Sequence, residues 1–229
     1  MRGSKLEKDV KRKNFIFVGE AGSGKSEIAI NFSKLLVGSR ERAVHFFDMD
    51  MTKPLFRSRD VKETMEREGV VFHHQEQFMD APTQVGGVVG SLKDHMRHVV
   101  MDVGGDHIGA RSIGAFAPYI NSDDTQIYYV LNVFRPWSFD IAHIDETLGK
   151  ILGVSHIKLD KLRMINNPNS GRTTTKEEFI SGSKKMLEIV APYAEIDFAC
   201  VREEIYEEVK GSIETPIMPL HLYLTYPWS

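Results

Sequence analysis

A glycine-rich segment that ends in lysine and serine carries the clearest chemistry in this sequence. It runs from Gly19 to Ser26 and follows the pattern Gly-x-x-x-x-Gly-Lys-Ser. Because glycine has no Cβ, such a segment can wrap its backbone closely around phosphate oxygens. The pattern therefore predicts a phosphate-binding loop, or P-loop, for a nucleoside triphosphate. Its candidate contacts are Gly19, Glu20, Ala21, Gly22, Ser23, Gly24, Lys25, Ser26 and Glu27.

Lys25 and Ser26 have separate predicted tasks within this loop. Lys25 would place a positive charge at the β- and γ-phosphates. Ser26 would hold Mg²⁺ through its hydroxyl group. The flanking patterns agree, since an apolar strand precedes the loop and apolar residues at helical spacing follow it up to Val37.

Two later apolar runs end in aspartate. One ends in Asp48-Met-Asp50, and the other ends in Asp102, which Gly105 follows in the pattern Asp-x-x-Gly. Ligands of parallel sheets bind at the carboxyl ends of strands. We expect Asp48 or Asp50 to hold Mg²⁺ or to orient the attacking water, and Asp102 to lie beside Mg²⁺ as a Walker B acid. Gly105 would let a backbone N–H approach the γ-phosphate.

Three other features remain open to two interpretations. Asp106 is a second catalytic acid or, as we favour, a helix cap. Asn166 and Asn167 follow a strand pattern, where their amides would read a purine edge or would simply form a turn. The motif Asn-Lys-x-Asp is absent, which favours adenine over guanine. Arg135 and Trp137 would form a partner contact or a packed loop.

Short apolar runs alternate with helical patterns along the whole chain. This predicts an α/β fold, a three-layer α/β/α sandwich with a mostly parallel, twisted sheet and crossover helices. We expect one domain over residues 1–229, with a lead-in at 1–13 and a C-terminal tail at 211–229 that docks on it. The expected strands are 15–18, 43–47, 70–72, 98–101, 126–133, 162–165, 196–199 and 221–224. The expected helices are 25–37, 61–68, 112–120, 139–152, 176–190 and 203–209, and residues 73–90 are expected to form a loop or a short broken helix.

The composition excludes several classes of function. The chain has 229 residues, a formal net charge of −3 and one cysteine, Cys200. It therefore lacks the basic excess of nucleic-acid-binding proteins and cannot form a multi-cysteine zinc site. No apolar run is long enough to span a bilayer, and we expect a cytoplasmic protein.

With these motifs assembled, the chain resembles P-loop ATPases of the MinD/ParA/CobQ group in the SIMIBI class. The resemblance rests on the P-loop, the Asp48-Met-Asp50 strand end, Asp102-Val-Gly-Gly and Asn166-Asn167, which come in the order of that group. It extends to a subset of ATP-binding proteins that share Gly-Ser-Gly-Lys-Ser-Glu-Ile-Ala. It implies ATP and Mg²⁺ as ligands, and switch regions at Asp48 or Asp50 and at Gly105. It also implies an adenine contact from Asn167.

One residue departs from the family pattern. MinD and ParA proteins carry a signature lysine where this chain has Glu20, and that lysine reaches the nucleotide of a dimer partner. A homodimer that uses this lysine mechanism is therefore not expected here.

The resulting hypothesis is a Mg²⁺-dependent ATPase whose nucleotide state is read by a partner protein. A CobQ-like or dethiobiotin-synthetase-like enzyme that activates a small carboxylate is one alternative. An ATP-binding scaffold without turnover is another. Arg57, Arg111 and Arg172 are the candidates for an arginine finger.

Overall fold

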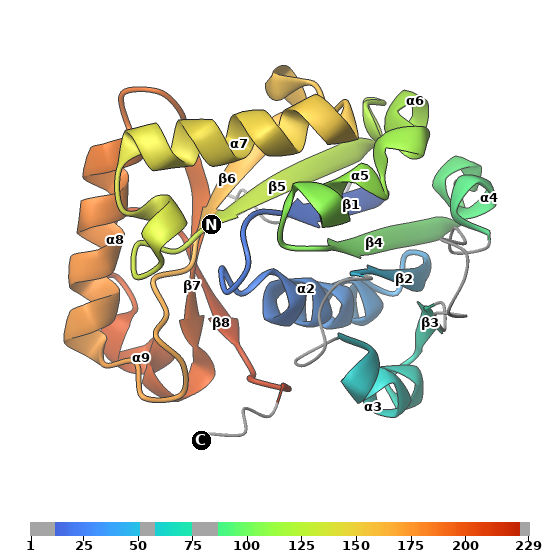
Figure 1. Cartoon of the computed structure of the whole chain (residues 1–229). Helices are drawn as coiled ribbons and strands as arrows, with labels where there is room; N and C mark the ends of the chain where they lie inside the picture. Colours follow the sequence, from blue (N-terminus) through green and yellow to red (C-terminus); the bar gives the residue numbers. More distant parts are fainter. Residues whose placement is uncertain (1–11, 51–57, 75–86, 225–229) are drawn as a thin grey trace.

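The structure is a computed structural model that describes residues 12–50, 58–74 and 87–224. Eight parallel strands form one sheet in the order β3-β2-β4-β1-β5-β6-β7-β8 (Figure 1). The strands are β1 (Asn14–Val18), β2 (Ala43–Met49), β3 (Val70–His73), β4 (Arg97–Val103), β5 (Thr125–Leu131), β6 (Leu162–Asn166), β7 (Ile196–Arg202) and β8 (Ile217–Leu220).

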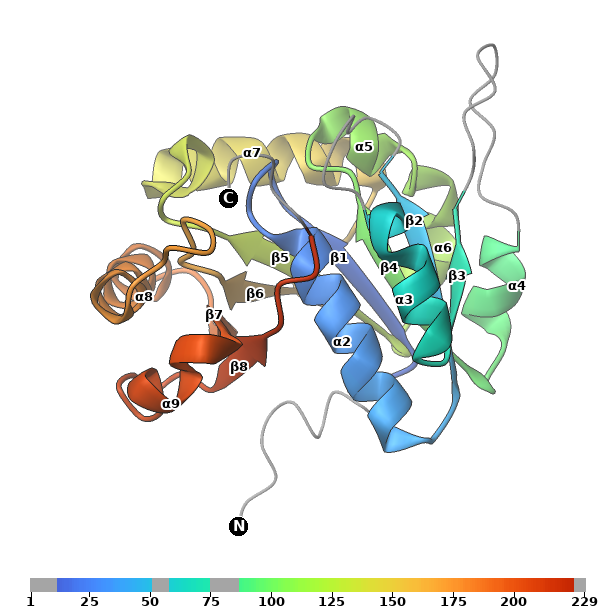
Figure 2. The ribbon, with the colours of Figure 1, turned by 90° about the horizontal axis from the view of Figure 1, so that it is seen from below.

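Helices connect these strands and cover both faces of the sheet (Figure 2). They are α2 (Lys25–Ser39), α3 (Lys62–Arg67), α4 (Val88–Lys93), α5 (His107–Arg111), α6 (Ala117–Ile120), α7 (Ile141–Ser155), α8 (Lys176–Val190) and α9 (Tyr206–Val209). Parallel strands need such crossovers, because the chain must return to the same end of the sheet before each new strand begins. The predicted α/β fold with a parallel sheet is confirmed.

Two apolar layers hold the helices to the sheet. On one face, α2 and α3 pack over aromatic strand residues, and the Phe15 and Phe32 ring centroids lie 4.7 Å apart. On the other face, α4 to α8 bury a larger layer that includes Ile127 and Ile151. All five residues of β1 are buried, so the central strand is fixed from both sides.

The predicted strands agree with the structure except for the last one. We expected residues 221–224 to form it, but the strand is β8, and residues 221–224 lie along α2 instead. The observed strand comes directly before the predicted one and contains Pro219. Among the described residues the strand pairs with β7 alone, and an edge strand tolerates a proline that cannot donate to the ladder.

Most predicted helices are also present, and α8 has the predicted bounds. The expected helix at 112–120 is broken into a 3-10 turn at Gly114–Phe116 and the short helix α6. A Cβ on Gly114 would lie 2.7 Å from the Val154 carbonyl oxygen, so the chain approaches α7 closely at this break. Of the expected irregular segment at 73–90, residues 75–86 lie outside the described residues, and α4 follows them.

Across the described part of the chain, no helix is long and apolar enough to cross a membrane.

Candidate functional site

The order of the strands in the sheet reverses at the central strand, β1. It lies between β4 and β5, and the chain forms β2, β3 and β4 on one side of it before it forms β5 to β8 on the other. Ligands of open α/β sheets bind in the crevice at such a switch point. The P-loop starts there, directly after Val18, and leads into α2.

The P-loop has a backbone that requires glycine at its last turn. Gly24 has a φ of 94°, in the left-handed region, and it directly precedes the first turn of α2. A Cβ on Gly24 would lie 2.1 Å from Nδ2 of Asn167. Conformation and close packing therefore both exclude a side chain at this position.

The carbonyl groups of the P-loop are held by donors from within the loop and from two neighbouring strand ends. These hydrogen bonds are Lys25 Nζ to Glu20 O at 3.1 Å, Trp137 Nε1 to Ala21 O at 3.0 Å, Arg135 Nε to Gly22 O at 3.2 Å and Asn167 Nδ2 to Ser23 O at 2.8 Å. Because these carbonyl groups are already bonded, the shape of the loop is set before a ligand binds, which lowers the ordering cost of binding.

The predicted acids lie together on the β2 and β4 side of the loop. Asp48 and Asp102 are direct register partners on β2 and β4, and both are fully buried. The backbone N–H of Asp50 donates to Oδ1 of Asp48 at 3.0 Å. Lys25 is also buried, at 1% exposure. The structure therefore brings together the lysine and the aspartates that the sequence pattern singled out.

Gly105 packs directly against the P-loop. A Cβ at this position would lie 2.8 Å from the backbone N of Ala21 and 3.1 Å from Nζ of Lys25. Only a glycine lets the segment after β4 come this close to the loop. Asp106 then accepts a hydrogen bond at 2.7 Å from the backbone N–H of Gly109 and caps α5, which confirms the helix-cap interpretation.

The donor set fits a Mg²⁺ ion that shares its coordination with phosphate. Within the described ranges, no group of three or more histidine, cysteine or acidic residues could hold a metal by itself. Mg²⁺ in nucleotide sites is held by one or two protein ligands and by phosphate oxygens. Ser26 and Asp102, with Asp48 beside it, supply such a partial set of oxygen ligands, and their roles as ligands stay predictions.

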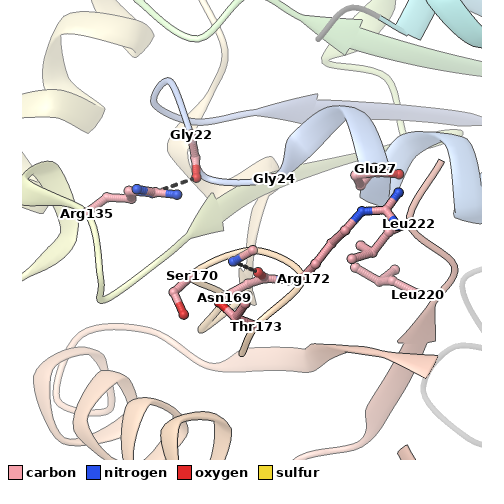
Figure 3. Close-up of a pocket in the computed structure, with 11 residues that line it drawn as sticks. Gly22, Gly24, Glu27, Arg135, Asn169, Ser170, Arg172, Thr173, Leu220 and Leu222 are labelled. Carbon is pink, nitrogen blue, oxygen red and sulfur yellow. Dashed lines mark hydrogen bonds between the residues drawn. The ribbon is translucent and has the colours of Figure 1, made fainter. Parts of the chain in front are cut away.

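A cavity lies beside the P-loop, on the side toward β6 and β8 (Figure 3). It has a volume of about 190 Å³ and connects the loop glycines with a polar loop after β6 and with apolar residues near β8. Its lining residues are Gly22, Gly24, Glu27, Arg135, Asn169, Ser170, Gly171, Arg172, Thr173, Leu220 and Leu222. We call this cavity the β6-side pocket.

The loop at 169–173 is stabilised by its own side chains. Oδ1 of Asn169 accepts from the backbone N–H of Gly171 at 2.5 Å and from the Thr174 hydroxyl group at 3.1 Å. The backbone carbonyl of Asn169 accepts from Nδ2 of Asn132 at 2.7 Å. Arg172 extends from this loop toward Glu27 (Figure 3).

The two asparagines predicted to read the base face different parts of the molecule. Asn167 lies under the P-loop, bonded to Ser23. Asn166 lines another cavity of about 460 Å³, which Ser183 of α8 and Glu214 also line. The structure therefore does not bring Asn166 to the P-loop, and of the two residues it favours Asn167 as a nucleotide contact.

Two acids of the P-loop have raised pKa values. Burial raises the pKa of Glu20, and the N–H of Ala21, 3.3 Å from its Oε2, partly offsets this. Burial also raises the pKa of Glu27, whose carboxylate accepts two backbone N–H groups from residues 223 and 224. At both acids, burial therefore raises the pKa more than the hydrogen bonds lower it.

Sequence reasoning missed Asn132 as a site residue. It lies at the end of β5, is 1% exposed, and bonds to the loop after β6 and, at 3.5 Å, to the carbonyl of Gly22. The rule for strand ends would have found it, but we expected the strand to continue to Val133. Arg135 and Trp137, left open between two interpretations, bind P-loop carbonyl groups.

Comparison with known proteins supports the fold and leaves the family open. No model of a protein family matches the sequence, and a comparison with curated proteins finds no match. Many solved structures are similar to this chain, among them the following three. The 54 kDa signal recognition particle protein from Aeropyrum pernix K1 in complex with GDP has a TM-score of 0.54 at 17% identity. Cell division protein FtsY from Thermotoga maritima has a TM-score of 0.56 at 15% identity. FlhF complexed with GTP and Mg²⁺ has a TM-score of 0.51 at 13% identity.

These alignments cover 82%, 83% and 81% of this chain, but only 41%, 62% and 63% of the three proteins. The chain thus spans less than two thirds of their length. Identity at this level shows a common fold alone. This chain shares its α/β fold with the three structures, and the SIMIBI class stays a prediction. The MinD/ParA/CobQ group and ATP as the nucleotide stay predictions.

Proposed function

We propose that this protein binds a nucleoside triphosphate with Mg²⁺ at the P-loop and acts as a nucleotide-dependent switch on a partner protein. The observation that carries the proposal is the packing of Gly105 against Ala21 and Lys25. A γ-phosphate bound beside Lys25 would lie next to this backbone, so its presence or absence would shift the segment after β4.

The same segment offers a route from the nucleotide to the surface. It continues into α5, which packs against α7, and Ile108 on α5 is 57% exposed. A partner that contacts α5 would therefore sense the γ-phosphate through a few residues. Mg²⁺, held by Ser26 and Asp102, would neutralise phosphate charge. Asp48 and Asp50 are the proposed positioners of the attacking water, and hydrolysis is proposed to be slow without the partner.

We propose ATP as the preferred nucleotide because the chain lacks the guanine motif Asn-Lys-x-Asp. GTP is the specific competitor to test, because two of the similar structures are named with GDP or with GTP and Mg²⁺. A tenfold preference, about 1.4 kcal/mol, is the scale of one well-placed hydrogen bond to the base.

Titration calorimetry with ATP and GTP, each with Mg²⁺ and with a chelator, tests this proposal. We expect Mg²⁺-dependent binding, at least tenfold tighter for ATP. Asp102→Asn should lose roughly 10–100-fold of the Mg²⁺-dependent affinity. Asp123→Asn is the matched control, because the Asp123 side chain is 99% exposed. Absence of binding would refute the nucleotide site, and equal affinities would refute the choice of base.

A further inference from the structure

The residues after β8 are hydrogen-bonded to α2, the helix that follows the P-loop. We call residues 221–224 the C-terminal strap. The Asn31 side chain donates to the His221 carbonyl at 2.8 Å and accepts from the His221 N–H at 2.9 Å. The Glu27 carboxylate accepts from the N–H groups of Tyr223 at 3.0 Å and Leu224 at 2.7 Å. Four backbone hydrogen bonds therefore hold the strap along α2.

These contacts follow one face of α2. Glu27, Asn31 and Lys34 are spaced at i, i+4 and i+7, so their side chains project on the same side of the helix. Lys34 bonds to the Tyr223 hydroxyl and forms an ion pair with Glu68 at 3.0 Å. Glu27 comes directly after Ser26, so the strap is bound within the first turn of the helix that the P-loop begins.

The strap and the end of β8 also form a wall of the β6-side pocket. Leu220 and Leu222 line it opposite the loop at 169–173 (Figure 3). Leu224 is 4% exposed and packs into the core under α2. The pocket thus has a polar side that carries Arg172 and an apolar side from the C-terminal residues. A flat purine base or a ribose needs this combination of an apolar surface and a few polar groups.

The Glu27 carboxylate is buried, which is energetically unfavourable without compensating contacts. It is 3% exposed, and burial of a carboxylate is unfavourable unless hydrogen bonds compensate for the lost water. The strap amides supply that compensation, and the N-terminal end of α2 favours negative charge there. Docking of the strap and the conformation of the first turn of α2 therefore depend on each other.

We propose that the C-terminal strap completes the nucleoside half of the nucleotide site, with Glu27 as the positioning residue that couples the strap to the P-loop helix. This inference rests on the proposed nucleotide binding. The base and ribose pack on Leu220 and Leu222, while the phosphates bind the P-loop. By linkage, a nucleotide that favours the docked strap is bound more tightly when the strap is docked.

Glu27→Gln tests this coupling, because glutamine has one acceptor oxygen where the carboxylate has two. We compare Mg²⁺-ATP with Mg²⁺-tripolyphosphate, which has the phosphates but no nucleoside, by calorimetry. We expect about tenfold weaker ATP binding and unchanged tripolyphosphate binding. Glu146→Gln, an exposed residue of α7, is the matched control and should change neither affinity.

A second variant, Leu222→Ser, changes the wall but keeps all four hydrogen bonds between the strap and α2, and it should give the same selective loss. Hydrogen exchange adds a direct readout, since ATP should slow exchange of the Tyr223 and Leu224 amides in the wild type but not in Glu27→Gln. An equal loss of tripolyphosphate affinity in Glu27→Gln, or unchanged ATP affinity in both variants, would overturn the inference. A wild type that binds neither ligand would instead overturn the proposed function, so the two failures are distinguishable.

Discussion

The two sides of β1 build their parts of the candidate site in different ways. On the β2 and β4 side, buried charged side chains at strand ends surround the P-loop, with Asp48 and Asp102 in direct register. On the β5 to β8 side, hydrogen bonds join side chains to backbone groups, from the carbonyl of Asn169 to the amides of the strap. We call the first the phosphate side and the second the nucleoside side, after the parts of the nucleotide that we propose they bind. The phosphate side depends on residue type, and the nucleoside side depends on chain path.

This difference determines which substitutions should matter on each side. On the phosphate side, loss of one charge removes a ligand contact directly. On the nucleoside side, a backbone contact survives most substitutions and fails only when its side-chain partner changes. Four predictions test this contrast.

Lys25→Ala should have the largest effect. It removes a charge-assisted contact to phosphate, so nucleotide affinity should fall by about 2–3 kcal/mol while the protein stays folded. Calorimetry with Mg²⁺-ATP measures this, and circular dichroism checks the fold. Lys150→Ala, in an exposed pair with Glu146, serves as the control and should bind normally. Undiminished affinity in Lys25→Ala would mean that the phosphates bind elsewhere.

Gly24→Ala should lower both stability and nucleotide affinity. The left-handed conformation alone costs a residue with a Cβ about 1–2 kcal/mol, and the contact with Asn167 adds to this. The matched control is Gly38→Ala in the same helix, where a Cβ would meet nothing within 4 Å. It should stabilise the protein by about 0.5–1 kcal/mol. Urea unfolding that gives both variants the same sign would contradict the P-loop geometry.

Trp137→Phe should have a smaller effect. It keeps a ring but removes the donor to the Ala21 carbonyl, so nucleotide affinity should fall by about 0.5–1.5 kcal/mol. Tyr193→Phe changes an aromatic residue that is 70% exposed in the turn after α8, and affinity should not change. If Trp137→Phe also binds normally, the loop keeps its shape without this donor.

His45 should give the smallest effect, on the pH dependence of stability at the outer edge of the phosphate side. Its Nδ1 lies 2.9 Å from Nε2 of His73, and burial, aided by the Arg97 charge, lowers the pKa of His45 from 6.5 to about 4. The folded state therefore binds this proton more weakly than the unfolded state. The free energy of unfolding therefore has its full value above pH 6.5. It decreases as the pH falls toward 4, because the unfolded state takes up the proton first.

Thermal unfolding between pH 7 and pH 4 checks this sign. The wild type should lose more stability over this range than His45→Gln, whereas His95→Gln, at an exposed position before β4, should follow the wild type. Parallel curves for all three proteins would show that the histidine pair does not contribute.

The same contrast explains what the sequence could predict. Motifs of the phosphate side consist of residue types at fixed spacing, so the sequence predicts Lys25, Asp48 and Asp102 together. Pocket residues such as Leu222 could not be found, because their role comes from a chain path set by Asn31 and Glu27. Likewise, the alternation of neighbouring side chains that separates Asn166 from Asn167 depends on where β6 ends.

Strand prediction failed for a related reason. The sequence pattern placed the last strand at 221–224, but the edge position of β8 makes Pro219 acceptable there, and the next residues follow α2 instead. Residues 51–57, which follow Asp50 and include Arg57, lie outside the described residues, so Arg57 as an arginine finger stays a prediction. Of the other arginine-finger candidates, Arg172 lines the β6-side pocket, and Arg111 lies in the last turn of α5.

The central place of β1 also has a consequence for folding kinetics. Asn14 pairs with Val99 on one side and with Thr125 on the other, so both neighbours of the strand come from much later in the chain. Such long-range closures are slow and must precede a stable sheet centre. A fragment that ends after α2 would contain the whole glycine-lysine-serine motif and yet have no neighbouring strands to hold it. We therefore expect the nucleotide to bind late in folding and to slow unfolding once bound.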